Sequence, residues 1–181
     1  MSKIWLIPLV FTILIASSAG SAFAAADYFL KIEGVDGEST DAKHKGQIEI
    51  DSFSWGVSNS GSMAAGGGGG AGKVQFQDFH FTKTVDKSSP KLMQAVATGE
   101  HLKTMDLTVR KAGGTQMEYY VIHLEDILVS SYSTSGSSGG LLMEEISFNY
   151  QKIEFEYIPQ NADGTAAGAV KASWNLATNT R

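Results

Sequence analysis

Cysteine is absent from the 181-residue chain, and proline and charged side chains are scarce. The lack of cysteine excludes disulfides, zinc–thiolate sites, iron–sulfur clusters and thiol nucleophiles. Charged residues make up 18% of the chain, below the usual ~25%, and the formal net charge is −5. Because phosphate binding needs a basic surface, this balance argues against nucleic acid as the main partner. A surface poor in charge also favours a domain that hides part of itself in an oligomer.

The first 24 residues differ from the rest in their hydrophobicity. Lys3 supplies a short positive region, residues 4–16 are almost wholly apolar, and small residues follow up to an Ala-Phe-Ala pattern at 22–24. This order is typical of a secretory signal peptide, and the apolar stretch is shorter than the ~20 residues that a membrane anchor needs. The sequence therefore predicts a cleaved signal peptide over 1–24. It also predicts one soluble domain over 25–181, with no membrane segment left after cleavage.

The domain has the pattern of an all-β protein. Apolar and polar residues alternate in segments separated by glycine-rich turns, which is typical of a barrel or sandwich. Strands are expected over residues 28–35, 47–57, 74–85, 103–111, 117–133 and 141–158, with a short last strand over 170–174.

Two of these strands change phase. In the sixth, apolar side chains stand at even positions up to Tyr150 and at odd positions from Ile153. The third changes in the same way between Phe76 and Phe79. Since side chains in a strand repeat every two residues, each change requires an extra residue and predicts a bend.

One helix is expected between the third and fourth strands. Ser88 or Ser89 is expected to cap its start, Pro90 suits the first turn, and Gly99 suits a left-handed end. The predicted core stripe of this helix consists of Leu92, Met93, Val96 and Ala97.

Motifs for catalysis, metal binding and cofactor binding are weak. Residues 67–73 have the glycine and lysine spacing of a phosphate-binding loop, but Val74 stands where Ser or Thr should hold magnesium, and a strand follows in place of a helix. The histidines have no metal-ligand spacing, and the serines show no G-x-S-x-G pattern. We therefore predict no catalytic residue, no metal site and no cofactor, and a protein that is not an enzyme.

Several motifs in order resemble one family. They are Phe53-Ser54-Trp55-Gly56, the run from Ser60 through the glycines to Lys73-Val74, Phe81-Thr82-Lys83, the segments 86–90 and 107–114, and Val129-Ser130-Ser131. Together they resemble the haemolysin-coregulated protein (Hcp) family, the tube subunit of the bacterial type VI secretion system. The resemblance extends over about residues 27–175.

The resemblance implies a mainly β fold, a two-sheet β-barrel with one side α-helix, similar to phage tail tube proteins. It implies hexameric rings that stack into a hollow tube inside a sheath and under a spike protein, with small effector proteins carried in the lumen. The alternative from another class is a secreted β-sandwich module that binds a ligand such as carbohydrate and does not assemble.

Two sites follow from the resemblance. Ser54, between inward-pointing Phe53 and Trp55, is expected to face the lumen as a cargo contact, or else to be an exposed serine without a partner. The glycine-rich loop is expected to connect stacked rings, or else to be idle. Its predicted stacking residues are Gly66, Gly67, Gly68, Gly69, Gly70, Gly72 and Lys73.

The predicted signal peptide departs from the family, whose tubes assemble in the cytoplasm. We favour an exported, ring-forming relative that is secreted or periplasmic. Two other interpretations stay open, namely a later true start, which gives ordinary cytoplasmic assembly, and an inefficient signal.

Overall fold

The computed structural model describes residues 26–61, 73–112 and 116–181, which form ten strands and one helix. All strand pairs are antiparallel. The elements are β1 (Ala26–Ile32), β2 (Ile48–Glu49), β3 (Ser52–Ser54), β4 (Val57–Asn59), β5 (Val74–Phe76), β6 (Phe79–Thr84), α1 (Ser89–Thr98), β7 (His101–Lys111), β8 (Glu118–Ser135), β9 (Met143–Tyr157) and β10 (Val170–Asn175).

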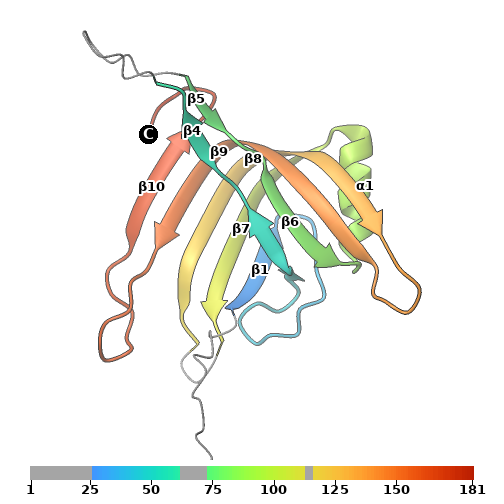
Figure 1. Cartoon of the computed structure of the whole chain (residues 1–181), viewed down its shortest axis with the longest axis horizontal. Helices are drawn as coiled ribbons and strands as arrows, with labels where there is room; N and C mark the ends of the chain where they lie inside the picture. Colours follow the sequence, from blue (N-terminus) through green and yellow to red (C-terminus); the bar gives the residue numbers. More distant parts are fainter. Residues whose placement is uncertain (1–25, 62–72, 113–115) are drawn as a thin grey trace, which may run out of the picture.

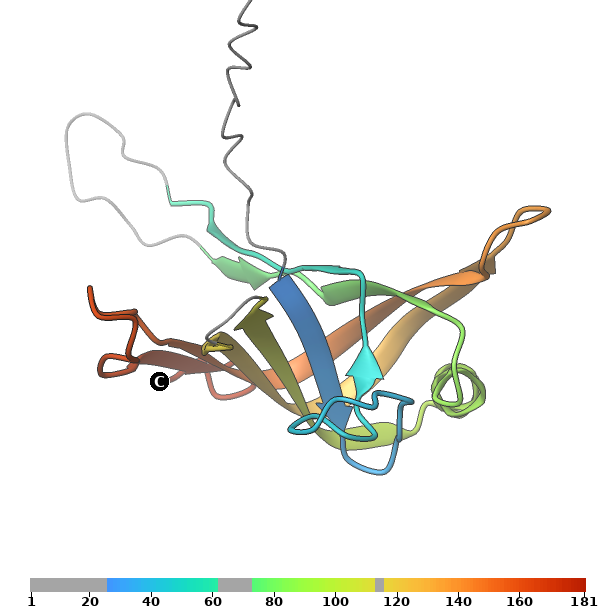
Figure 2. The same cartoon turned by 90° about the horizontal axis from the view of Figure 1, so that it is seen from below.

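The main sheet curls round so that its two end strands come together at the short segment 50–51, which joins them in the sequence (Figures 1 and 2). Its strand order is β2-β1-β7-β8-β9-β6-β3, so the end strands β2 and β3 are neighbours in the sequence. Between them, the Ile50 N–H donates to Tyr28 O (3.2 Å) and the Asp51 N–H donates to Thr82 O (2.8 Å). The expected strand over 47–57 is therefore split, and its two halves close the barrel from opposite sides.

The long β8–β9 hairpin joins two parts of the main sheet. The first half of β9 pairs with β6 and the second half pairs with β10, while β8 follows β9 along both halves. Buried side chains change phase on both strands, between Leu124 and Ile127 on β8 and between Tyr150 and Ile153 on β9. Because both strands change together, their register is kept across the break, where Asp126 has a φ of 51°. The predicted bend in the sixth strand is thus confirmed, with its partner strand bending beside it.

The predicted break in the third strand is also present, in a different form. Instead of a bulge in one strand, residues 77–78 separate β5, which pairs with β4, from β6, which pairs with β3 and β9. The apolar phase changes there because the two strands belong to different sheets.

Helix α1 packs against β8 and lies beside the barrel (Figure 1). Leu92 and Ala95 are buried, but Met93 is 50% exposed and Ala97 is exposed, so half of the predicted core stripe is wrong. The predicted serine cap is also wrong, since neither serine caps the first turn with its side chain.

The two ends of α1 are capped in different ways. At the start, the Asp86 carboxylate accepts the Ser88 N–H (2.9 Å). The Ser88 hydroxyl donates to the same carboxylate and therefore does not cap the first turn. The end is as predicted, with Gly99 in the left-handed conformation at φ 67°. The described residues contain no helix that is long and apolar enough to cross a membrane.

The barrel interior holds the core and the buried cation of Lys83. Lys83 is fully buried, and its Nζ lies 2.7 Å from Glu144 Oε2 and 2.7 Å from Asp86 Oδ1. The same ammonium donates to Ser89 Oγ (2.9 Å) and to the Thr84 carbonyl (3.1 Å), so it is fully solvated by protein. This cluster ties the start of α1 to the ends of β6 and β9. The structure as a whole confirms the predicted mainly β barrel with one side helix.

Candidate functional site

Ser54 points away from the core, as the alternation in β3 predicts. The neighbouring Phe53 and Trp55 both pack against the core: the Phe53 ring stacks 5.9 Å from that of Phe79, and Trp55 Nε1 donates to the Tyr120 hydroxyl (3.0 Å). Because side chains alternate along a strand, Ser54 between them is exposed on the outer face of the barrel.

Two rows of polar residues cross four strands on this outer face. Residues opposite one another in an antiparallel ladder share a face, so the register defines each row. Both rows run in the strand order β3, β6, β9 and β8. The first row is Ser54, His80, Ser147 and Ser131, and the second is Ser52, Thr82, Glu145 and Ser133. We call these eight side chains the polar wall.

Hydrogen bonds connect neighbours within the rows. Ser131 Oγ donates to Ser147 Oγ (2.8 Å), and Ser147 Oγ lies 2.6 Å from His80 Nδ1. In the second row, Ser52 Oγ and Thr82 Oγ1 are 2.7 Å apart. When Ser147 accepts from Ser131, its own proton is directed to His80 Nδ1, which leaves the outward Nε2 as the protonated nitrogen of the neutral ring. The wall is thereby a fixed arrangement of short donors and acceptors.

The inner face of the same strands explains why the wall is rigid. Phe81 lies 6.2 Å from Phe79 and 5.1 Å from Phe148, ring centre to ring centre. Large aromatic rings thus stand on one side of the sheet and small hydroxyls on the other. Because core packing fixes these backbones, it also fixes the positions of the wall residues.

The wall's chemistry suits reversible, non-covalent contact. Six of its eight side chains are hydroxyls, one is the imidazole of His80, and the only carboxyl group is that of Glu145. The buried Ser147 beside His80 has the look of a nucleophile and base, but His80 makes no hydrogen bond to a carboxylate among the described residues, so the third group of a triad is missing there. Such a surface can exchange weak hydrogen bonds with a passing molecule.

Of the wall, the sequence prediction found Ser54 alone. His80 and Ser147 were missed, although a signal was present: each stands between two buried apolar residues in its strand. Ser131 was also missed, and its place follows from a register shift between Val129 and Ser131 that the local pattern does not show. Lys73, the predicted stacking residue, is exposed directly before β5. The predicted Gly66–Gly70 and Gly72 lie outside the described residues.

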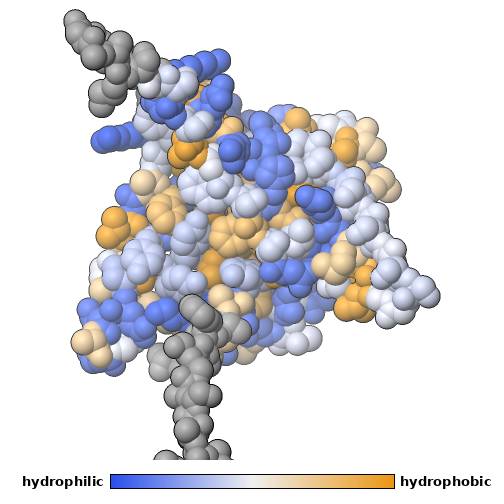
Figure 3. Space-filling model, in the orientation of Figure 1, coloured by the Kyte–Doolittle hydropathy of each residue, from blue (hydrophilic) through white to orange (hydrophobic). Residues whose placement is uncertain are grey.

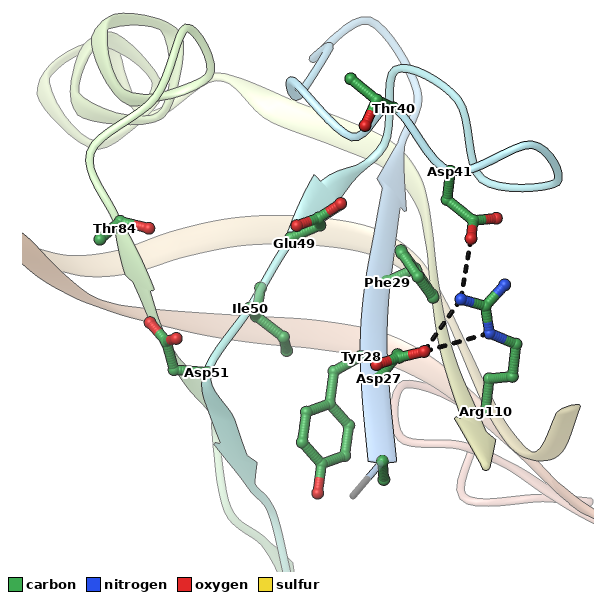
Figure 4. Close-up of a pocket in the computed structure, with 11 residues that line it drawn as sticks. Asp27, Tyr28, Phe29, Thr40, Asp41, Glu49, Ile50, Asp51, Thr84 and Arg110 are labelled. Carbon is green, nitrogen blue, oxygen red and sulfur yellow. Dashed lines mark hydrogen bonds and ion pairs between the residues drawn. The ribbon is translucent and has the colours of Figure 1, made fainter. Parts of the chain in front are cut away.

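A second polar cluster lies beside β1 (Figure 4). Arg110 is buried, and its Nη2 bonds to Asp27 Oδ2 (2.9 Å) and to Asp41 Oδ2 (2.8 Å). The guanidinium also lies over the Phe29 ring, whose other neighbour is the stacked His44 ring. The Arg110 hydrogen bond holds the pKa of Asp41 well below its ordinary value.

This second cluster is structural. Asp41 and His44 belong to the long connection between β1 and β2, and Arg110 belongs to β7. The adjoining cavity of about 500 Å³ is lined mainly by polar groups, and its one cation is already bound by two carboxylates. Across residues 26–61, 73–112 and 116–181, no group of three or more His, Asp or Glu is placed to hold a metal ion.

Comparison with known proteins identifies the family. Residues 29–157 match the family described as "Type VI secretion system effector, Hcp". Protein hcp1 of Pseudomonas aeruginosa is 49% identical over 158 residues, which cover 86% of this chain and 98% of that protein. The chain belongs to the Hcp family.

Solved structures agree with this assignment to Hcp. A type six secretion system protein has 36% identity and a TM-score of 0.82, with 86% of this chain and 99% of that chain covered. Hcp1 from Salmonella typhimurium has 34% identity and a TM-score of 0.73, with coverages of 86% and 98%. These comparisons confirm the predicted family and its function as a ring-forming type VI tube subunit. They do not favour the secreted ligand-binding module.

Proposed function

We propose that this Hcp protein is a structural subunit that closes into hexameric rings with the polar wall turned toward the pore, and that it acts without catalysis. The observation that carries the proposal is the pair of polar rows on the outer face of β3, β6, β9 and β8. An outer sheet face that holds hydroxyls in place of apolar groups stays hydrated and does not stick to a neighbouring copy.

Ser54 is the proposed cargo contact at the edge of this wall. Its hydroxyl is small, exposed and next to His80, so it leaves room for a small effector protein and can exchange hydrogen bonds with it. Spike and sheath proteins are the further partners proposed from the family, at the end and the outside of the tube. Lys73 and the glycine-rich segment before it are the proposed stacking elements.

Labelling at Ser54 tests the orientation of the wall. Because the chain has no cysteine, Ser54→Cys creates a single thiol for a bulky maleimide label. The matched control is Met93→Cys on the exposed side of α1. We expect electron-microscopy class averages of labelled rings to show added density inside the pore for Ser54→Cys and outside the ring for Met93→Cys. Density outside the ring for Ser54→Cys would contradict the proposed orientation.

We also propose that the protein is exported after cleavage behind Ala24. Mass spectrometry of the N-terminus of protein purified from cell fractions tests this step. A mature chain that begins at Ala25 outside the cytoplasm is expected. Recovery of intact Met1 from cytoplasmic rings supports cytoplasmic assembly instead.

A further inference from the structure

The β8–β9 turn ends in a pair of exposed leucines, Leu141 and Leu142, directly before β9, and we call this pair the tip. Leu141 is 76% exposed and Leu142 is 53% exposed, and the neighbouring Val85 is 42% exposed. The tip is held in place, because the Val85 N–H donates to the Leu142 carbonyl (3.0 Å) and the Leu142 side chain lies against Gly136. Apolar colour gathers over this hairpin at the lower right of Figure 3. An ordered apolar tip in water indicates a binding surface.

An apolar groove opens elsewhere, between β5 and the end of β10. It has a volume of about 670 Å³, and its apolar lining is Val74, Phe76, Trp174 and Leu176. The groove exists because the second half of β9 pairs with β10, while β5 pairs with β4, so the two sheets diverge. The four apolar side chains are only partly buried, so each keeps a face toward the groove.

The tip and the groove lie at opposite ends of the subunit. Figures 1 and 2 both show the β8–β9 turn at one end of the longest axis and the β4, β5 and β10 end at the other. A single copy therefore cannot bring its own tip to its own groove. Complementary surfaces at opposite ends generate head-to-tail contacts, which continue as an open stack when they do not close.

Charge adds to this complementarity. Lys73 lines the groove, and Glu145 follows the tip by three residues; both are exposed. Neither makes an ion pair with another residue in the part of the chain that the structure describes. Lys73 thus places a positive charge at the groove, and Glu145 places a negative charge beside the tip. Opposite charges at the two ends favour a contact between copies in a single orientation.

We propose that the Leu141–Leu142 tip of one copy inserts into the Val74–Phe76–Trp174–Leu176 groove of a second copy in the next ring. Glu145, the polar-wall residue of β9 nearest the tip, then lies at the rim of the pore near Lys73 of that copy. This inference rests on the proposed ring and names the contact that stacks one ring on another. The occupant of the groove is a second copy of this chain, because the chain itself carries an apolar tip and an opposite charge at the end that faces it.

The first test removes the apolar tip. The double variant Leu141→Ser, Leu142→Ser is expected to form rings of unchanged mass by light scattering, because both side chains are exposed. Mean tube length in electron micrographs should fall about tenfold or more, since burial of even one leucine changes an association constant by that factor. The matched control is Met93→Ser, because Met93 on α1 is an apolar residue about as exposed as Leu142, and its tubes should match the wild type.

The second test reverses the charges. Glu145→Lys alone and Lys73→Glu alone should each shorten the tubes, and the two changes together should restore length. Tubes of wild-type length from the double-leucine variant, or a combined reversal no better than either single change, would overturn the contact while leaving the ring intact. Wild-type chains that stay monomeric at every concentration would overturn the proposed ring, and the stacking contact with it.

Discussion

The two faces of β6 carry opposite kinds of residue at alternate positions. Phe79, Phe81 and Lys83 point inward and are fully or almost fully buried, whereas His80 and Thr82 belong to the polar wall. The inward residues decide whether the barrel forms. The outward residues contribute little to folding and decide what the outside of the barrel presents. Adjacent residues in one strand should therefore differ sharply in what their substitution does.

Phe81→Ala is the strongest way to test this contrast. It removes a ring packed between Phe79 and Phe148 and should cost about 3–5 kcal/mol of unfolding free energy. Thr82→Ala, one residue later on the outer face, should change it by no more than about 0.5 kcal/mol. Urea unfolding at matched protein concentration measures both. Similar losses for the two variants would show that the faces are not separate in energy.

Lys83→Met sharpens the contrast, because Lys83 is a charge on the inner face. Without the ammonium, Glu144 and Asp86 keep buried or half-buried carboxylates without a cation, and we expect a loss of about 3–5 kcal/mol. Lys87→Met, at an exposed position close by, is the control and should be nearly neutral. Combining Lys83→Met with Glu144→Gln should recover part of the loss. No recovery would mean that the ion pair is not the cause.

Acid should weaken the Arg110 cluster selectively. The pKa of Asp41 is lowered from its ordinary 3.8 in the folded chain, so the unfolded chain takes up the proton first. The stabilisation is therefore fully present above about pH 4 and is lost as the pH falls toward the folded pKa. Asp41→Asn should flatten the dependence of unfolding free energy on pH between 5 and 2. Parallel profiles for the variant and the wild type would contradict this role.

Shortening the glycine-rich loop should have the smallest effect on stability. Deleting Gly66–Gly70 changes loop closure entropy slowly, so the unfolding free energy should move by less than about 0.6 kcal/mol. Tube formation should nevertheless weaken if the loop connects rings as predicted from the sequence. Electron micrographs with tubes of unchanged length would count against that role.

The sequence predicted most of the barrel because its strands alternate clearly. The bends were visible as phase changes, and Gly99 marked the end of α1. The same alternation also indicated the buried ion pair: Lys83 is in phase with Phe79 and Phe81, and Glu144 is in phase with Ile146. That signal went unused, because buried charges are rare and both partners must be considered together.

Other features depend on contacts between distant segments. The split into β2 and β3 follows from Ile50 and Asp51 bonding to two different strands, which no local pattern announces. Met93 fits a helical apolar stripe, yet α1 meets β8 along the side that carries Leu92 and Ala95. Likewise, His80 becomes part of a site only through Ser147, which lies 67 positions away in the sequence.

The shared change of phase in β8 and β9 has a mechanical consequence. Since both strands run unbroken from the part of the main sheet that contains β6 to the part that contains β10, a force applied at one end of the subunit travels along two covalent backbones to the far end. Side-chain packing between the two parts of the sheet need not transmit this force. A subunit pushed along its longest axis can thus transmit the force through the β8–β9 hairpin while the rest of the barrel keeps its shape.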